Sequence, residues 1–556
     1  MEISGNIIDL FTKEIHPGTI TVRDGRIAAI HRQSGPYAHY ILPGFIDAHI
    51  HIESSLLTPS AFAGLALPHG TVATLSDPHE IANVAGVAGI DFMLANAAFS
   101  PLKFHFGAPS CVPATPFETA GAALGPAEVR GLLARDTIFF LSEVMNYPGV
   151  LAGEEEVMAK IRAAHALGKP VDGHAPGLGG AGLDAYIRAG ISTDHECVTL
   201  EEAREKAAKG MHILLRQGSA ARNFDALLPL LAECPDQCMF CSDDLYADEL
   251  ATGHIDALVR SALAQGAELM AVLRAACLAP VLHYRLPVGV LRKGDPADFI
   301  VVDDLTRMRV LSTYINGRLV AHEGHCLLPP TPVRHSLPRM RATPRTPEQF
   351  AVPCQPGALK VIEAIDGQLV TGSKRVAPLC RDGKVVADPK RDILKCVVVS
   401  RYQDQPPAVG FITGFGLQAG AMASSVGHDS HNILAVGVSD QALCQAINLV
   451  ISHGGGLAAL SGADEFCLPL AVAGLMSMED GAHVARAFTR LHRLVQEMGC
   501  PLQAPFMTLS FMALLVIPEL KLSDQGLFDS SRMEFTPLFD GFAKTAPPPL
   551  ARPVTY

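Results

Sequence analysis

Residues 43–51 read Pro-Gly-Phe-Ile-Asp-Ala-His-Ile-His, an apolar run that ends in two histidines separated by one residue. Because side chains two apart on a β-strand lie on the same face, this run predicts a strand that points His49 and His51 in one direction. Glu53-Ser54-Ser55 follows directly. Such an ending is typical of a barrel strand that supplies two ligands to one metal ion. A His-x-His pair also arises by chance, so the interpretation depends on further ligand-type residues at later strand ends.

The segment that begins with this strand alternates strand and helix patterns, with helical periodicity at 153–167 and 254–265 for example. Alternation of this kind favours a parallel sheet, and eight units in this length fit a (β/α)₈ barrel. The predicted strands are residues 44–50, 71–77, 104–112, 137–145, 170–175, 192–196, 211–219 and 238–243.

Two short strand-and-turn segments, 1–42 and 288–328, flank the barrel segment 43–287. We therefore expect an α/β protein in which a TIM-like (β/α)₈ barrel is inserted into a small β-sandwich domain formed from both flanks. A proline-rich linker is predicted at 329–349, and a C-terminal α+β domain at 350–556.

The composition limits the partners and the cellular location. Hydrophobic residues make up 49% of the chain, the formal net charge is −12 and there is no tryptophan. The acidic balance argues against a nucleic-acid partner. No apolar run is long enough for a membrane span, and the first residues show no secretory signal. The 13 scattered cysteines indicate reduced thiols, so we expect a cytoplasmic protein.

The ends of the predicted strands carry side chains that bind metals. Active sites of (β/α)₈ barrels lie at the carboxyl ends of the strands. Four imidazoles and two carboxylates at these ends suit a site for two metal ions, which lowers the pKa of a bound water toward ~7. Asp243 is placed to take a proton from that water and return it to a leaving amine. Each of these residues alone could be structural, and only the set favours a metal site. The six candidates are His49, His51, Glu143, His174, His195 and Asp243.

One competing motif combines His51-Ile52-Glu53 with Cys238-Met239-Phe240-Cys241 and imitates the zinc nucleobase deaminases. No proline precedes Cys238, and the two halves are far apart in the sequence. Cys238 and Cys241 would also lie on opposite faces of a strand, so they could not bind one ion there. This interpretation is therefore set aside.

Longer segments carry a family resemblance. The sequence resembles the amidohydrolase superfamily and, within it, the adenine deaminases, over nearly the whole chain. The late segments extend the resemblance into the C-terminal domain, which few other amidohydrolases carry. The matching segments are residues 43–55, 76–86, 143–150, 171–180, 218–223, 253–260, 427–433, 468–477 and 505–511.

The resemblance implies hydrolysis of adenine to hypoxanthine and ammonia, by a metal-activated hydroxide that attacks C6, in purine salvage and adenine catabolism. It implies two divalent ions, Mn²⁺ or Fe²⁺, with Zn²⁺ as an alternative. By position, His49, His51 and Asp243 would hold one ion, His174 and His195 the other, and Glu143 would bridge them. The implied partner is the free purine base. The apolar C-terminal domain makes a homo-oligomer, such as a dimer, the expected assembly.

Other polar residues are candidates for substrate contact. Asp77, His79 and Glu80 lie just past the second strand. They either contact substrate, by binding purine nitrogens or shuttling a proton, or they fix the loop. The arginine on strand seven either reaches the pocket or pairs with an acid. The polar segment 427–432 either closes over the barrel mouth or forms an internal turn. The residues concerned are Asp77, His79, Glu80, Arg216, His428 and His431.

Two departures from the family pattern lie at strand ends seven and eight. Gln217 replaces the usual glutamate, and Leu245-Tyr246 stands where a basic residue usually follows the aspartates. These two departures leave open the alternative that the protein is a related amidohydrolase that acts on another 6-substituted purine or another C–N bond. A non-catalytic scaffold is a further alternative. A scaffold would be expected to lose metal ligands, and all six candidates are present.

Overall fold

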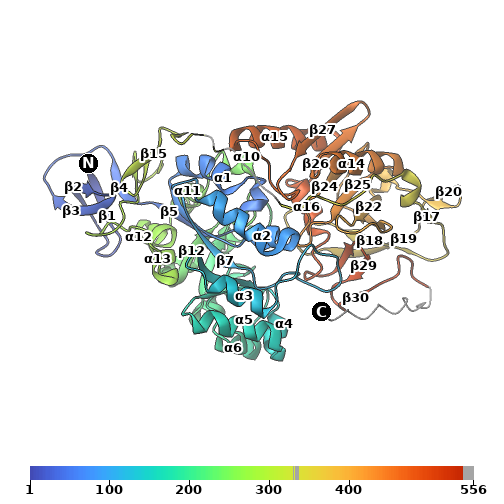
Figure 1. Ribbon diagram of the computed structural model, residues 1–556, viewed down its shortest axis with the longest axis horizontal. Helices are drawn as coiled ribbons and strands as arrows, with labels where there is room; N and C mark the ends of the chain where they lie inside the picture. Colours follow the sequence, from blue (N-terminus) through green and yellow to red (C-terminus); the bar gives the residue numbers. More distant parts are fainter. Residues whose placement is uncertain (330, 332–336, 542–556) are drawn as a thin grey trace.

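Eight parallel strands form a barrel in the N-terminal half of the chain. The computed structural model describes residues 1–329, 331 and 337–541 (Figure 1). Five strands form one sheet in the order β5-β6-β7-β8-β9, and three form a second in the order β10-β11-β12. The strands are β5 (Phe45–Ile50), β6 (Thr71–Ser76), β7 (Lys103–Ala108), β8 (Ile138–Val144), β9 (Val171–Gly173), β10 (Thr193–Asp194), β11 (His212–Arg216) and β12 (Cys238–Cys241).

Backbone hydrogen bonds join the two sheets into a closed barrel. The Asp243 amide donates to the His49 carbonyl at 2.9 Å, and the His51 amide donates to the Asp243 carbonyl at 3.2 Å. On the opposite side the Ser192 amide donates to Val171 at 3.0 Å. Gly173 permits this approach, because a Cβ there would lie 2.3 Å from the Thr193 carbonyl oxygen. The predicted barrel is confirmed, although several strands are shorter than predicted because the chain leaves the sheet to form loops at the mouth.

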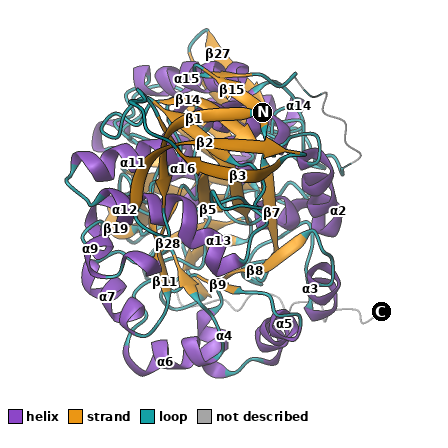
Figure 2. Ribbon diagram, turned by 90° about the vertical axis from the view of Figure 1, so that its left-hand side faces the viewer, coloured by secondary structure: helices purple, strands orange, loops and turns teal. Residues whose placement is uncertain are grey.

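Helices surround the barrel, as Figure 2 shows from one end of the molecule. They bury apolar faces against the strands, as the alternating pattern requires. The helices are α1 (Pro59–Ala66), α2 (His79–Ala97), α3 (Pro126–Leu133), α4 (Tyr147–Ala152), α5 (Glu155–Ala166), α6 (Gly180–Arg188), α7 (Leu200–Ala208), α8 (Phe224–Leu227), α9 (Leu230–Glu233), α10 (Ala247–Leu250), α11 (Ile255–Ala264), α12 (Leu269–Leu273) and α13 (Ala279–Tyr284).

Strands from both flanks of the barrel pair in one eight-stranded sheet, ordered β16-β15-β14-β13-β4-β1-β2-β3. The two flanks meet where β13 pairs antiparallel with β4, Phe299 opposite Pro43. The sheet curls until Arg26 bridges Pro296, and it encloses a separate apolar core. Its strands are β1 (Glu2–Asp9), β2 (Glu14–Arg23), β3 (Arg26–Arg32), β4 (Tyr40–Pro43), β13 (Phe299–Val302), β14 (Val310–Ile315), β15 (Arg318–His322) and β16 (His325–Cys326).

The C-terminal part is built on a second eight-stranded sheet, ordered β19-β18-β23-β22-β25-β24-β26-β27. In β22, Val397 and Val399 face a core shared with α14, whereas Cys396 and Val398 face the core that continues into the barrel. The strands are β18 (Leu359–Glu363), β19 (Gly372–Val376), β22 (Leu394–Val399), β23 (Ala408–Thr413), β24 (Ala421–Ser424), β25 (Ile433–Gly437), β26 (Gly456–Ser461) and β27 (Asp464–Pro469), and the helices are α14 (Asp440–Ser452), α15 (Gly481–Glu497) and α16 (Pro505–Phe511).

Two small three-stranded sheets complete this part. They consist of β17 (Val352–Pro353), β20 (Cys380–Arg381) and β21 (Lys384–Val385), and of β28 (Leu520–Ser523), β29 (Gly526–Asp529) and β30 (Glu534–Phe535). Parts of the predicted linker and of the predicted C-terminal domain, residues 330, 332–336 and 542–556, lie outside the described residues. The domain boundaries stay predictions.

One disulfide departs from the expectation of reduced thiols. Cys354 and Cys380 are bonded, with their Cα atoms 6.0 Å apart, and the other 11 cysteines are free. The pair is brought together by the small sheet of β17, β21 and β20, which the cysteine spacing does not reveal. No helix among the described residues has the length and apolar character needed to cross a membrane.

Candidate metal centre

Three of the predicted ligands meet where the first and last barrel strands close. His49 lies in β5, His51 follows it, and Asp243 follows β12, and all three are buried. The Nε2 atoms of His49 and His51 are 3.2 Å apart, and they lie 3.6 Å and 3.1 Å from Asp243 Oδ1. These three side chains offer one donor atom each, all within 4.8 Å of one another, so a single cation fits among them.

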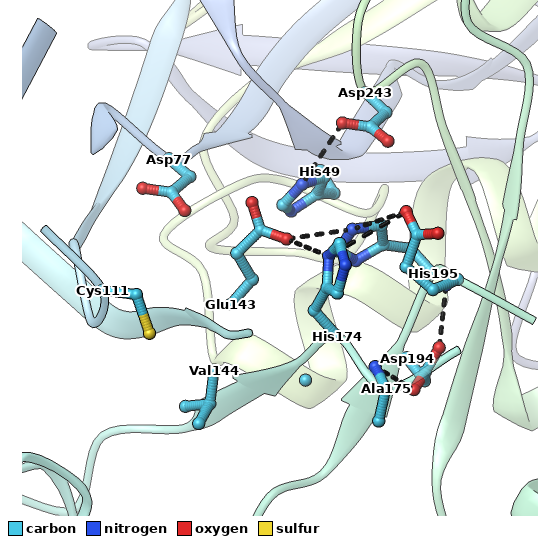
Figure 3. A network of polar contacts seen from close by, with 12 residues as sticks. His49, Asp77, Cys111, Glu143, Val144, His174, Ala175, Asp194, His195 and Asp243 are labelled. Atoms are coloured by element: carbon cyan, nitrogen blue, oxygen red, sulfur yellow. Dashed lines mark hydrogen bonds and ion pairs between the residues drawn. The ribbon is translucent and has the colours of Figure 1, made fainter. Parts of the chain in front are cut away.

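The other three predicted ligands lie across the mouth, on β8 and just after β9 and β10 (Figure 3). Glu143 Oε2 is 2.6 Å from His174 Nδ1 and 3.2 Å from His195 Nε2. Its other oxygen, Oε1, is 3.3 Å from His51 Nε2. Glu143 therefore lies between the two groups of imidazoles, where one carboxylate can contact two ions.

The charge states of these groups suit cation binding. Burial and the neighbouring imidazoles hold the pKa of His49 well below its usual value, so its ring is neutral. Burial alone would raise the pKa of Glu143 and Asp243, but His174 and Arg216, respectively, hold these carboxyls well below their usual range. Burial alone would lower the pKa of His51, His174 and His195, but the carboxylates around them raise it, so these rings hold protons that a bound cation would displace. Neutral imidazoles and ionised carboxylates are the forms that bind divalent metals, and metal binding releases such protons, so the donor set fits the group.

Asp47 supports this cluster, although the sequence interpretation did not single it out. It lies in β5 two residues before His49, and its Oδ1 accepts hydrogen bonds from the Ser242 amide at 3.0 Å and the His49 amide at 3.3 Å. Its Oδ2 contacts His254 Nε2 at 2.8 Å. The same two-residue period that pairs His49 with His51 places Asp47 on their face, and this signal could have identified it.

Lys206 on α7 fixes the loops that carry His174 and His195. Its Nζ donates to the Ala175 carbonyl at 2.7 Å and to Asp194 Oδ2 at 3.0 Å. Asp194 in turn accepts the Ala175 and Glu196 amides at 3.1 Å and 2.7 Å. The sequence interpretation also missed this pair, because no local pattern connects a helical lysine to two strand ends.

The sequence left open whether Arg216 reaches the pocket or pairs with an acid. In the structure it does both, because it lines a cavity at the barrel mouth and its guanidinium pairs with two carboxylates. Its Nη1 is 2.5 Å from Asp243 Oδ2 and forms a very short ion pair with Glu196. Glu196, which the sequence interpretation missed, lies 3.6 Å from His195 Nε2 through its Oε1. Glu196 directly follows the candidate ligand His195 in the sequence, and this position could have identified it as part of the site.

The candidates for substrate contact gather on one side of the cluster. His79 and Glu80 begin α2, and the loop between β24 and β25 brings His428 and His431 against them. His79 Nδ1 is 3.4 Å from Glu143 Oε1, and His428 Nδ1 is 2.5 Å from Glu80 Oε1. Segment 427–432 thus packs against the barrel mouth, and it is also an internal hydrogen-bonded turn, in which the His431 amide donates to the Gly427 carbonyl at 2.7 Å.

Two cavities that share the lining residues His174, Glu196 and Arg216 lie at the mouth. A cavity of about 30 Å³ touches the metal cluster and is lined by His79, Glu80, Arg216 and His428 among others, but not by Asp77 or His431. A larger one of about 400 Å³ lies outside it, between barrel loops and segments 367–370 and 516–518 of the C-terminal part.

The residues that depart from the family pattern do not line either cavity. Among the described residues, the walls of the two cavities do not include Gln217, Leu245 or Tyr246. Tyr246 instead packs on Phe488 of α15, with ring centroids 4.2 Å apart.

The sequence is similar to known proteins along nearly its whole length. The amidohydrolase family model matches residues 40–320, and the model of the adenine deaminase C-terminal domain matches residues 368–534. An adenine deaminase of Salinibacter ruber is 54% identical over 97% of this chain and 98% of its own length. One of Methanosarcina acetivorans is 49% identical over 96% of this chain and 99% of its own length.

A barrel with histidines and carboxylates converging at its mouth is the architecture of the metal-dependent amidohydrolases, and the match over residues 40–320 defines this class. The C-terminal match and the identity along the full length narrow it further: the chain belongs to the adenine deaminase family.

Proposed function

We propose that the chain is an enzyme that hydrolyses adenine to hypoxanthine and ammonia. The proposal is carried by the buried group of four imidazoles and two carboxylates at the barrel mouth of a chain in this family. Because Gln217 and Leu245–Tyr246 do not line the cavities, they give no support to a different substrate. A non-catalytic scaffold is not supported either, since the predicted ligands lie together.

We assign two divalent ions, Mn²⁺ or Fe²⁺, with Zn²⁺ as an alternative that the same donors accept. His49, His51 and Asp243 would hold one ion, His174 and His195 the other, and Glu143 would contact both. When bound, the ions supply a water of lowered pKa that is a nucleophile at neutral pH.

The protein's own groups position the purine and move protons. The base enters through the larger cavity, which is wide enough for a heterocycle, and its amino-bearing edge turns toward the cluster. Asp243 is the proton carrier. Its Oδ1 faces the imidazoles and Arg216 lies 2.5 Å from its Oδ2, so the carboxylate is held in place at the cluster as it takes a proton and gives it to the departing amine.

The surrounding walls exclude bulk water from this transfer. The six ligand side chains are buried, and His428 on segment 427–432 lines the inner cavity. His79, Glu80, Arg216 and His428 are placed to contact substrate, whereas Asp77 and His431 would act through their neighbours. We further propose a cytoplasmic location, a role in purine salvage, and assembly into a homodimer.

The test is ammonia release from free adenine by chain reconstituted with Mn²⁺ or Fe²⁺, beside a chelated control. We expect metal-dependent release with hypoxanthine formed in equal amount. Two bound ions without release would refute the proposed substrate.

A further inference from the structure

One fully buried lysine of the C-terminal part binds the backbone of residues that line the cavities at the barrel mouth. Lys521 lies in β28, and its side chain is enclosed on all sides. Its Nζ donates hydrogen bonds to the Leu369 carbonyl at 2.7 Å and to the Phe511 carbonyl at 3.0 Å. Leu369 lines both cavities, and Phe511 lines the inner one. One amine thus holds two separate pieces of the cavity lining.

The two pieces come from different places in the C-terminal part. Leu369 lies in the loop between β18 and β19, and Phe511 is the last residue of α16. A lysine near the end of a helix can bind the last carbonyl groups, which lack partners within the helix. The Phe511 carbonyl also accepts the Leu514 amide at 3.2 Å, within the turn that follows the helix. Lys521 therefore joins a loop to a helix end.

Thr371 connects the same two pieces a second time. Its amide donates to the Pro518 carbonyl at 3.0 Å, and its carbonyl accepts the Glu519 amide at 3.1 Å. Its hydroxyl donates to the Leu520 carbonyl at 2.9 Å. Segments 367–370 and 511–518 are thus held together as one surface that faces the barrel loops across the cavities, and we call them the C-terminal wall.

Stability alone does not account for a lysine at this position. Within the described part of the chain Lys521 forms no ion pair with a carboxylate, and burial lowers its pKa to about 7. An apolar side chain of the same length would be easier to bury, because it has no amine to remove from water. What the lysine adds is a pair of N–H donors, and both of them fix carbonyls of cavity-lining residues.

We propose that Lys521 is a positioning residue for the substrate, which holds in place the C-terminal wall against which the purine binds. This inference rests on the proposed function. Lys521 lines neither cavity, so it acts through Leu369 and Phe511. The Phe511 ring stacks on His428, with centroids 5.2 Å apart, and His428 is one of the side chains placed to contact substrate. Loosening the wall should weaken purine binding and leave the proton transfer at Asp243 unchanged.

The test separates KM from kcat in the metal-loaded chain. For Lys521→Met we expect the KM for adenine to rise about tenfold with kcat within about twofold, because interactions that bind substrate and transition state equally change KM alone. Lys395→Met is the matched control. Lys395 is also a buried lysine of the C-terminal part, and its Nζ donates to the Phe350 carbonyl at 2.9 Å and pairs with Asp440 at 2.5 Å. Phe350 lines neither cavity, so this variant should lower Tm without changing KM.

A second measurement does not depend on catalysis. Hydrogen–deuterium exchange, followed by mass spectrometry, reports how firmly the C-terminal wall is held. We expect amide exchange in segments 367–370 and 511–518 to be faster in Lys521→Met than in the natural chain, and unchanged in Lys395→Met. If Lys521→Met does not fold, Thr371→Val replaces it, since it removes only the hydroxyl that binds Leu520 and should change KM and exchange in the same direction.

Each outcome decides the proposal. Unchanged exchange in the C-terminal wall, or an unchanged KM for adenine, would overturn the role of Lys521. An equal rise of KM in Lys395→Met would overturn it as well, because the effect would then follow from lost stability in general. A natural chain that binds its ions but does not hydrolyse adenine would refute the proposed function, and exchange alone would then show whether Lys521 holds the wall.

Discussion

The substitution Lys206→Met removes a buried cation that connects the loops of two candidate metal ligands. Lys206 and Asp194 are both fully buried, and their charged atoms are 3.0 Å apart. A third contact, to Glu202 Oε1 at 2.7 Å, ties the lysine to its own helix. Burial alone would lower the pKa of Lys206, but Asp194 holds it above its usual range, so the lysine is charged.

Methionine matches the length of the lysine but leaves Asp194 buried without its partner. Breaking a buried pair in this way costs about 3–5 kcal/mol of unfolding free energy. Asp194 binds the amides next to His174 and His195, so the loss also reaches the metal centre. Supporting residues of this kind change metal affinity by roughly 10–100-fold.

Urea unfolding of metal-free chain measures the loss of unfolding free energy, and a competition titration with a metal indicator measures the loss of metal affinity. Lys209→Met is the control, because Lys209 lies at the end of the same helix and pairs with Asp184 and Glu205 on the surface. Screened surface pairs contribute little, so we expect the control to behave as the natural chain. An equal loss of stability in both variants would refute the role assigned to Lys206.

Three further substitutions test other parts of the molecule. Asp243→Asn should keep the fold and lower kcat by about 10²–10⁴-fold, as expected for loss of a proton carrier; near-normal turnover would contradict its role. Glu143→Gln should weaken metal binding at least about tenfold, and two fully bound ions at low metal concentration would exclude a bridging carboxylate. Burial lowers the pKa of Lys521 from its ordinary 10.5 to about 7. Between these values the unfolded chain binds a proton that the folded chain does not, so Lys521 makes stability fall as the pH drops from about 10.5 to about 7. Lys521→Met should flatten this slope in thermal melts at pH 7 and 9, and equal slopes would contradict the assignment.

Much of the barrel follows from local sequence. The His49–His51 pair indicates a strand face because side chains alternate along any strand, whatever surrounds it. The alternation of strand and helix patterns then predicts a parallel barrel, whose strand ends must meet at one mouth. For this reason His174, His195 and Asp243 could be proposed as neighbours of His49 without a structure.

Tertiary structure alone decides the contacts between elements far apart in the chain. The sequence did not reveal that Lys206 contacts the loops after two barrel strands, or that Glu80 meets His428 from the loop between β24 and β25. It also suggested that Tyr246 affects the substrate, whereas its ring packs on Phe488. The periodicity of helices and strands depends on residues close together in the chain, so it can be predicted from the sequence. The partner of a buried charge is set by how whole layers pack, which no local pattern records.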